Sequence, residues 1–293
     1  MPKRASARRE PTDDEILLGD NLELLPAFAD ESFQLIYIDP PFNRGGVRSR
    51  RTLRVRARED GERVGFGGRR YGASVLRESS YGDEFDDYLG FLEPRLEHAR
   101  RLLAREGTLY FHIDYREAHY CKLLLDEIFG RECFLNEIIW AYDYGARSTR
   151  RWPAKHDTIL VYVKDRGAYH FDASAVDREP YMAPGLVGAE KAARGKLPTD
   201  VWWHTIVPTS GGEKTGYPTQ KPEGIVGRMV LASTRPGDWC LDFFAGSGTL
   251  GAVARKLGRR YVLIDSNPEA VAIMRARLGE AEGEASRRRR SGS

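Results

Sequence analysis

The chain has 293 residues, 41% of them hydrophobic, with a formal net charge of +3 and a mean hydropathy of −0.52. This is enough apolar material for one large domain or two small ones, and no apolar stretch approaches the 18 residues of a membrane span. The basic N-terminus lacks the apolar run of a secretory signal, and the three cysteines are far apart and odd in number. We therefore expect a protein of the reducing cytoplasm, without a disulfide scaffold and without a membrane partner.

Positive charge is concentrated in two segments. Residues 44–77 contain eleven arginines and three acidic residues, and four consecutive arginines occupy 287–290. The rest of the chain is acidic on balance, which favours a polyanionic partner for the basic segments. The alternative is a solvated arginine-rich loop that has no partner.

Apolar runs and helical patterns alternate along the first part of the chain. Residues 1–14 are expected to be a disordered basic tail. Buried strands are expected at 15–20 and 33–38, with a short helix at 21–29 between them. The Gly- and Arg-rich residues 43–80 show no clear period, so a long loop is expected there.

The alternation continues through the remaining residues, which predicts an α/β fold with a mostly parallel sheet. The further expected helices are 84–105, 116–129, 222–234, 248–257 and 268–279, and the further expected strands are 108–113, 137–142, 158–163, 239–243 and 261–265. Glycine, proline and aromatic residues are scattered without period over 165–217, which indicates an insertion. Residues 281–293 are expected to be a second disordered basic tail.

A glycine-rich turn at 242–249 (DFFAGSGT) connects an expected strand to an expected helix. Glycines let the backbone approach a ligand closely, and the start of a helix offers free N–H groups. No Gly-Lys-Ser/Thr follows, so this is not a phosphate-binding P-loop. The next strand ends in Asp265, which could accept both hydroxyls of a ribose, or else Asp265 or Ser266 caps the following helix. Together these features favour an adenosine-containing cofactor without a polyphosphate requirement.

A second motif, Asp39-Pro40-Pro41-Phe42, follows the buried strand at 33–38. In α/β proteins ligands bind at the carboxyl ends of the strands. Prolines remove N–H donors and leave carbonyl oxygens as acceptors, so Asp39 and the Pro40 carbonyl can accept both hydrogens of an exocyclic amine. Phe42 can stack on the base that carries the amine. The alternative is a capped turn with Phe42 in the core.

The two motifs resemble those of S-adenosylmethionine-dependent DNA amino-methyltransferases. Residues 19–21 (GDN) resemble the family's segment near the cofactor adenine, and residues 217–222 (YPTQKP) resemble the segment before its cofactor strand. Two further segments, 137–140 and 155–162, resemble the family's last two strands. The Asp39 motif precedes the glycine-rich turn by roughly 200 residues, an order that resembles the circularly permuted β group of this family.

This resemblance implies a permuted Rossmann-like methyltransferase fold, with a mostly parallel seven-stranded sheet and helices on both faces. Residues 15–164 would form the catalytic half, 165–217 a target-recognition insertion and 218–280 the cofactor-binding half. The residues implied to be catalytic are Asp39, Pro40, Pro41 and Phe42. Those implied to bind the cofactor are Asp20, Asn21, Asp39, Lys221, Phe244, Ala245, Gly246, Ser247, Gly248, Thr249, Asp265, Ser266 and Asn267. Lys221 could instead be solvated.

The resemblance implies methyl transfer to adenine N6 of a base flipped out of double-stranded DNA, with S-adenosylhomocysteine as product. Arginines of 44–77 could hold phosphates. Asp39 favours adenine, because family members acting on cytosine N4 more often have serine there. The alternatives are a cytosine-N4 enzyme, an RNA methyltransferase and a catalytically silent nucleic-acid-binding module.

The remaining expectations concern metals and partners. The six histidines lack ligand spacing, so no metal is expected. His112 and Asp114 either line the active cleft or are satisfied polar residues at a strand end. A homodimer and a companion restriction enzyme are possible partners.

Overall fold

The computed structural model describes residues 8–43, 47–57, 63–64, 70–82, 85, 87–145, 147–208 and 211–279. The chain divides into two compact units, residues 1–40 together with 89–293, and residues 41–88. Of the two expected disordered tails, residues 1–7 of the first and the whole of the second, 281–293, lie outside the described residues. Residues 8–14 are described and are tied to the larger unit, since the N–H of Arg9 donates to the Ala27 carbonyl and Arg260 pairs with Asp14.

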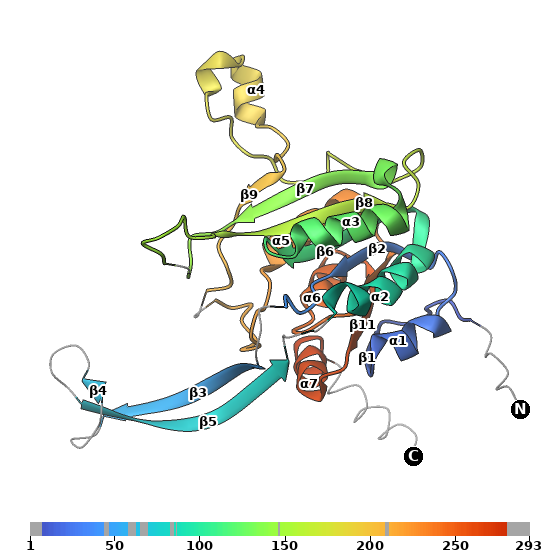
Figure 1. Ribbon diagram of the computed structural model, residues 1–293. Coiled ribbons are helices and arrows are strands. Elements are labelled where there is room, and N and C mark those ends of the chain that lie inside the picture. The colour runs from blue at the N-terminus through green and yellow to red at the C-terminus, as the bar shows by residue number, and fades with distance from the viewer. Residues whose placement is uncertain are drawn as a thin grey trace, which may run out of the picture. The chain divides into compact units, whose positions relative to one another are not determined.

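The larger unit is built on an eight-stranded sheet (Figure 1). In spatial order the strands are β1 (Glu15–Leu18), β11 (Arg260–Asp265), β10 (Trp239–Asp242), β2 (Phe33–Ile38), β6 (Leu103–Asp114), β8 (His156–Val163), β7 (Phe134–Ala141) and β9 (Val201–Trp203). The first five are parallel, β8 is antiparallel to both neighbours, and β9 is parallel to β7. Seven strands were expected. The eighth, β9, comes from the insertion, where three residues are too few to show a period.

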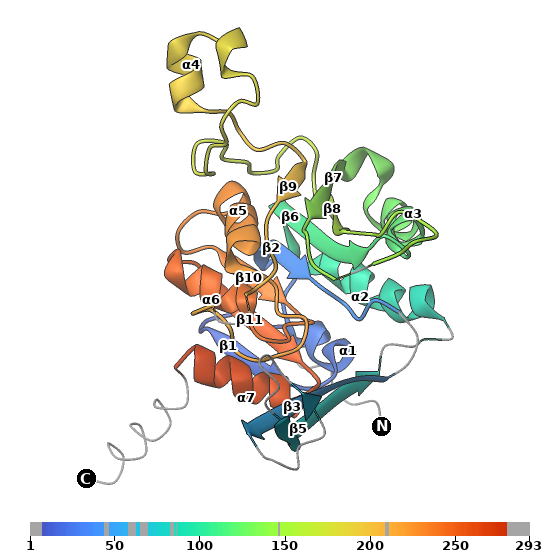
Figure 2. The same ribbon diagram turned by 90° about the vertical axis from the view of Figure 1, so that its left-hand side faces the viewer.

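Helices cover both faces of this sheet (Figure 2). Those on one face are α5 (Glu223–Ser233), α6 (Thr249–Lys256) and α7 (Pro268–Arg277), and those on the other are α1 (Asn21–Leu24), α2 (Tyr88–Leu102) and α3 (Ala118–Phe129). The short helix α4 (Ala189–Arg194) stands away from the sheet beyond β9. Single 3₁₀ turns occupy Leu25–Ala27, Arg131–Cys133 and Pro184–Leu186.

Central strands are buried on both faces, which explains why their sequences are continuous apolar runs. In β2, Leu35, Ile36 and Ile38 are all fully buried. The expected α/β class and its mostly parallel sheet are therefore confirmed. Within the described ranges, no helix combines the length and apolar character that crossing a membrane requires.

The smaller unit is a three-stranded antiparallel sheet in the order β3-β5-β4, formed by β3 (Val47–Ala57), β4 (Arg63–Val64) and β5 (Arg70–Gly82). The prediction of a loop over 43–80 is therefore wrong. β3 pairs with β5 from Val47↔Gly82 to Ala57↔Tyr71. The sequence does carry a strand pattern, because most arginines of 48–56 alternate with apolar residues at 47, 53, 55 and 57. The high arginine content obscured this period of two.

Candidate active site

Aspartates mark the carboxyl ends of all five parallel strands. Asp39 follows β2 directly and Asp20 follows β1 after one glycine, whereas β6, β10 and β11 end in Asp114, Asp242 and Asp265. Parallel strands end at one edge of a sheet, so these carboxylates share the edge where α/β folds bind ligands. Because β10 pairs with β2, the two sequence motifs lie next to each other there.

The carboxylate of Asp39 is held by Lys221. The ammonium Nζ lies 2.7 Å from each of the two carboxylate oxygens, and the side chains are only 16% (Asp39) and 9% (Lys221) exposed. Lys221 is thus not a solvated lysine. Its own carbonyl accepts the hydroxyl of Thr249 at 3.2 Å, which ties this ion pair to the start of α6. An ion pair of this kind holds the Asp39 carboxylate in one orientation.

The glycine-rich turn has the left-handed backbone that glycine permits, with φ of +50° at Gly246 and +72° at Gly248. Asp265 fixes this turn: its Oδ2 accepts the N–H of Gly246 and its Oδ1 the N–H of Asn267, both at 2.8 Å. Neither Asp265 nor Ser266 caps α7. The cap is Asn267, whose side chain accepts the N–H of Glu269 at 2.9 Å.

The far side of the turn is anchored from α7. Arg277 donates to the carbonyl of Ser247 at 3.0 Å and to Glu223 at 2.8 Å. Ser247 and Thr249 are both buried, and Ala245 donates its N–H to the Ile264 carbonyl. The predicted cofactor residues of the turn therefore form one rigid loop between β10 and α6.

Asn21 and Arg95 connect this loop to the other face of the sheet. Asn21 donates to the Phe243 carbonyl at 2.9 Å, and Arg95 Nε donates to the Asn21 Oδ1 at 2.7 Å. Arg95 also reaches Asp20, which caps α1. The nitrogen and the oxygen of the Asn21 side chain thus each make one hydrogen bond within the protein. The sequence analysis did not predict a role for Arg95. Its position one residue before Leu96, on the buried stripe of α2, could have indicated that this arginine is buried.

We expect Arg95→Met to lower the free energy of unfolding by about 2–4 kcal/mol, because it leaves the buried Asn21 oxygen without its donor and loosens the turn. Chemical denaturation measures this. The matched control is Arg100→Met on the exposed face of the same helix, for which a change within about 0.5 kcal/mol is expected. Equal effects of the two substitutions would contradict the role given to Arg95.

Asp242 is one of the deeply buried acids of this edge, with 3% of its surface exposed. Burial raises its pKa well above the ordinary value, and the charges of Asp39 and Asp265 add to the rise, while the backbone N–H of Phe244 and the charge of Lys221 oppose it. Burial likewise raises the pKa of Asp265. Clustered carboxylates of this kind favour a cationic ligand, which would offset their mutual repulsion.

The raised pKa of Asp242 makes stability depend on pH. The unfolded chain releases this proton near pH 4, before the folded protein does, so the free energy of unfolding falls as pH rises through the folded-state pKa. Asp242→Asn removes this titration but keeps an acceptor for Phe244. We expect the variant's stability relative to the wild type to improve as pH rises above about 4, until the folded-state carboxyl group is itself ionised; denaturation curves over a pH series measure this. A pH-independent difference would contradict the assignment.

His112 and Asp114 prove to be satisfied polar residues at the end of β6. His112 is fully buried between the Tyr37 hydroxyl at 3.0 Å and Asp157 at 3.3 Å, and Asp114 pairs with Arg116. Neither is a free group of the cleft. No cluster of histidines, cysteines and acids suitable for a metal ion occurs in the ranges that the structure describes.

The Asp39 motif crosses the boundary between the two units. Asp39 and Pro40 belong to the larger unit, whereas Pro41 and Phe42 belong to the smaller one. Within the smaller unit, the Tyr88 hydroxyl donates to the Pro41 carbonyl at 2.6 Å. The Pro40 carbonyl, not that of Pro41, therefore stays the candidate acceptor beside Asp39.

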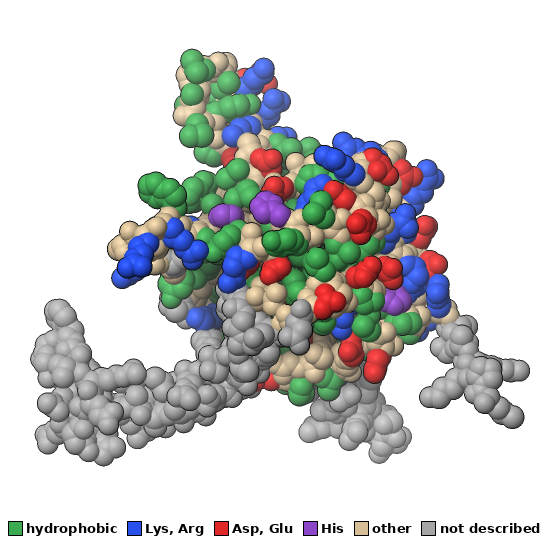
Figure 3. All heavy atoms as spheres, in the orientation of Figure 1, with side chains coloured by type: hydrophobic (Ala, Val, Ile, Leu, Met, Phe, Trp, Pro, Cys, Tyr) green, Lys and Arg blue, Asp and Glu red, His purple; other side chains and the backbone are tan. Residues whose placement is uncertain are grey.

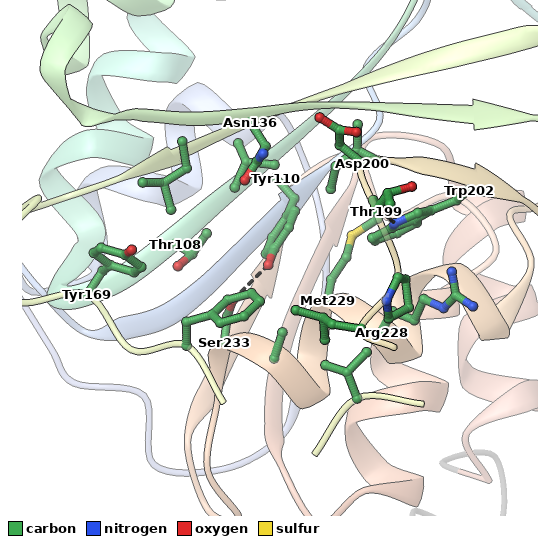
Figure 4. A pocket seen from close by; sticks show the side chains of 18 of the residues that line it. Thr108, Tyr110, Asn136, Tyr169, Thr199, Asp200, Trp202, Arg228, Met229 and Ser233 are labelled. Carbon is green, nitrogen blue, oxygen red and sulfur yellow. Dashed lines mark hydrogen bonds between the residues drawn. The ribbon is translucent and has the colours of Figure 1, made fainter. Parts of the chain in front are cut away.

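A cavity of about 530 Å³ lies away from this edge, on the α5 side of β6, β7 and β8 (Figure 4). Residues of the insertion, including Tyr169, Thr199 and Trp202, also line it. The hydroxyls of Tyr110 and Ser233 bond to each other at 2.7 Å in its wall. The buried hydroxyl of Thr108 has no hydrogen-bond partner within the described part of the chain.

We expect Thr108→Val to raise the free energy of unfolding by about 1 kcal/mol, because a methyl group of the same size replaces an unpaired buried hydroxyl. The matched control is Thr234→Val, whose hydroxyl donates to the Val230 carbonyl at 2.6 Å and accepts from Arg259 at 3.0 Å. That variant should lose about 1–3 kcal/mol. A loss of stability at Thr108 as well would contradict this prediction.

The fold and the carboxyl-edge site together define an α/β enzyme that binds a nucleotide-like cofactor. A family model described as DNA methylase, N6_N4_Mtase, matches residues 33–276, and the chain belongs to this family of DNA methyltransferases. The resemblance in the two motifs is thereby confirmed. The members are S-adenosylmethionine-dependent enzymes that act on DNA.

Curated relatives agree with this membership. The chain is 29% identical over 268 residues to the type II methyltransferase M.HpaI of Haemophilus parainfluenzae, covering 91% of this chain and 74% of the relative. It is 30% identical over 274 residues to the DNA adenine methyltransferase YhdJ of Escherichia coli K12, covering 91% of this chain and 83% of that protein.

Solved structures share the fold at low sequence identity. The chain superposes on a complex of M1.HpyAVI with S-adenosylmethionine at a TM-score of 0.58 and 20% identity, covering 90% of this chain and 98% of the other. The cytosine-N4-specific PvuII DNA methyltransferase gives a TM-score of 0.62 at 16% identity, covering 92% and 87% of the two chains. A putative DNA modification methylase of Thermus thermophilus, complexed with S-adenosylmethionine, gives 0.57 at 19% identity, covering 91% and 93%.

Proposed function

We propose that this chain methylates adenine N6 of a base flipped out of double-stranded DNA at a specific site, with S-adenosylmethionine as methyl donor. The observation that carries the proposal is the position of Asp39. Its carboxylate lies at the carboxyl end of β2, beside the strand that leads into the glycine-rich turn, and Lys221 holds both of its oxygens.

Asp39 suits an exocyclic amine. The lone pair of such an amine is delocalised into the ring, and hydrogen bonds from its two hydrogens to Asp39 and the Pro40 carbonyl favour a tetrahedral nitrogen with an available lone pair. Preorganised acceptors also stabilise the positive charge that develops on nitrogen during transfer. Orientation of the amine toward the methyl group supplies the rest of the acceleration.

The neighbouring residues fit the cofactor. S-adenosylmethionine supplies an activated methyl group on a cationic sulfonium. Asp39, Asp242 and Asp265 form an acidic edge that a cationic group would relieve. The glycine-rich turn leaves its backbone accessible, and Asp265 retains acceptor capacity for ribose hydroxyls, since each of its oxygens accepts one N–H. The further residues that we propose at the cofactor are Asp20, Asn21, Lys221, Phe244, Ala245, Gly246, Ser247, Gly248, Thr249, Ser266 and Asn267.

Adenine is favoured over cytosine by two observations. An aspartate, rather than a serine, stands at the start of the catalytic motif. The relative YhdJ, 30% identical over 91% of this chain, is a DNA adenine methyltransferase. The cytosine-N4-specific PvuII enzyme shares the fold at 16% identity. Similarity at that level concerns the fold and carries no information about which base is methylated.

The domain roles and partners belong to the same proposal. Residues 15–164 would carry catalysis, 165–217 would recognise the target and 218–280 would bind the cofactor. We also propose a cytoplasmic enzyme that forms a homodimer and accompanies a restriction enzyme, as the type II designation of the relative M.HpaI suggests.

Nucleoside mass spectrometry tests the reaction. The purified protein is incubated with mixed-sequence duplex DNA and methyl-labelled S-adenosylmethionine, and the DNA is digested to nucleosides. Labelled N6-methyladenine is expected. Labelled N4-methylcytosine would overturn the choice of base and keep the reaction class. Labelling of RNA but not duplex DNA in a parallel assay would overturn the DNA substrate.

A further inference from the structure

The hairpin between β7 and β8 ends in a basic tip, residues 143–155. The tip contains four basic residues and one acidic residue, Asp143, which pairs with Lys155 at 3.2 Å. The whole insertion 165–217, by comparison, has six basic and seven acidic residues. Positive charge in the larger unit is therefore denser at the hairpin tip than in the segment that composition marked for target recognition.

The hairpin extends past the edge that carries Asp39. Asp39 follows Ile38, which is level with Phe111 of β6, and Asp114 at the end of β6 is level with Asp157 of β8. Residues before 156 therefore lie beyond the carboxyl ends of the parallel strands. β8 is two strands from β2, about 10 Å away. That distance corresponds to about three base-pair steps of a duplex.

The exposed side chains of the tip are of two kinds. Trp152 is 94% exposed, and Tyr144 is 66% exposed. Arg147, Arg150 and Arg151 are exposed too, and within the described ranges no partner contacts their guanidinium groups. Basic and hydrophobic side chains gather at this end of the hairpin in Figure 3. Isolated exposed arginines are ordinary, but three of them beside a fully exposed tryptophan form a surface suited to a nucleic acid.

Hydrogen bonds at the base and within the loop fix the backbone of the tip, while the side chains of Arg147, Arg150, Arg151 and Trp152 point into solvent. The N–H of Tyr142 donates to the Lys155 carbonyl at 2.9 Å, and the Tyr142 hydroxyl donates to Asp157 at 3.1 Å. The Ser148 hydroxyl accepts the N–H groups of residues 150 and 151, each at 3.2 Å. These bonds hold the tip in a defined shape, so that little ordering is needed when a partner binds.

We infer that the tip of the β7–β8 hairpin grips the DNA duplex within a few base pairs of the target base: Arg147, Arg150 and Arg151 bind phosphates and Trp152 stacks on a base. The inference rests on the proposed function. Arginine–phosphate contacts position a protein on DNA, and an aromatic ring stacks on any base. The hairpin is thus a DNA-binding element additional to the insertion.

Equilibrium binding of a fluorescent mixed-sequence duplex, measured over a range of NaCl concentrations, tests this inference without requiring turnover. The slope of log affinity against log salt should become less steep by about 2.7 in the triple variant Arg147→Ala, Arg150→Ala, Arg151→Ala, since each phosphate contact contributes about 0.9. Trp152→Ala should weaken binding about 5- to 150-fold, and Trp152→Phe should restore most of it.

The matched control removes three exposed arginines elsewhere, Arg100, Arg131 and Arg275. Arg100 lies in the last turn of α2, just before β6, and Arg131 lies just before β7, so both lie at the opposite edge of the sheet. The control should keep the wild-type slope. A slope of the hairpin variant equal to that of the wild type, with methylation intact, would overturn the inference alone. Absence of duplex binding by the wild-type protein would overturn the proposed function and the inference with it.

Discussion

Asp39→Asn should reduce kcat for methyl transfer about 10²–10³-fold while leaving cofactor affinity within about fivefold. The amide replaces one anionic acceptor by an N–H₂ group that repels the amine hydrogens, so charge developing on the substrate nitrogen loses its stabilisation. Turnover is measured with labelled cofactor on duplex DNA, and cofactor affinity by titration calorimetry. Wild-type turnover would remove Asp39 from the catalytic machinery.

The choice of asparagine follows from the contact with Lys221. Alanine at position 39 would leave a nearly buried ammonium unpaired, at a cost of about 3 kcal/mol, and activity could then be lost through unfolding. The amide oxygen still accepts a hydrogen bond from Lys221. Asp126→Asn is the matched control, because it alters another Lys–Asp pair, with Lys122 at 2.6 Å on α3, outside the site. It should keep kcat.

Gly248→Ala should lower the free energy of unfolding by about 2–5 kcal/mol and weaken cofactor binding at least tenfold. A left-handed backbone costs a non-glycine residue about 1–2 kcal/mol, and overpacking adds about 1–3 kcal/mol. At φ +72° the added Cβ would lie 2.7 Å from Cγ of Met274, an atom close to the α7 backbone that has little room to move. Relief of this contact would displace the turn itself.

Gly227→Ala supplies the contrast for this prediction. Gly227 lies within α5, and an added Cβ there meets no atom within 4 Å. Alanine in a helix interior should raise the free energy of unfolding by about 0.5–1 kcal/mol. Thermal or chemical denaturation of the two variants, together with cofactor titration, separates the backbone requirement of the turn from a general effect of glycine replacement. Destabilisation of similar size at both positions would contradict the account.

Local sequence predicted the elements that carry the site. The continuous apolar run of β2 indicated a strand buried on both faces, and the glycine-rich turn indicated a strand-to-helix connection; both occur as expected. The strands of the arginine-rich segment were not predicted, because the many charged residues masked their period of two. Strand β9 was not predicted either, because it is only three residues long. Its pairing with β7 is a long-range property that no local pattern reports.

The α/β fold could be predicted from the sequence, since apolar periodicity and glycine or proline punctuation act within a few residues of the chain, and the resemblance of the two motifs indicated the family. The bonding partner of each polar group in the site became known from the folded structure alone. That structure paired Lys221 with Asp39 across 182 positions, assigned Asp265 to the glycine-rich turn and brought the unpredicted Arg95 to Asn21. Hydrogen bonds and ion pairs require atoms within about 3 Å of each other, and packing of the sheet between its helices, not order along the chain, sets those distances.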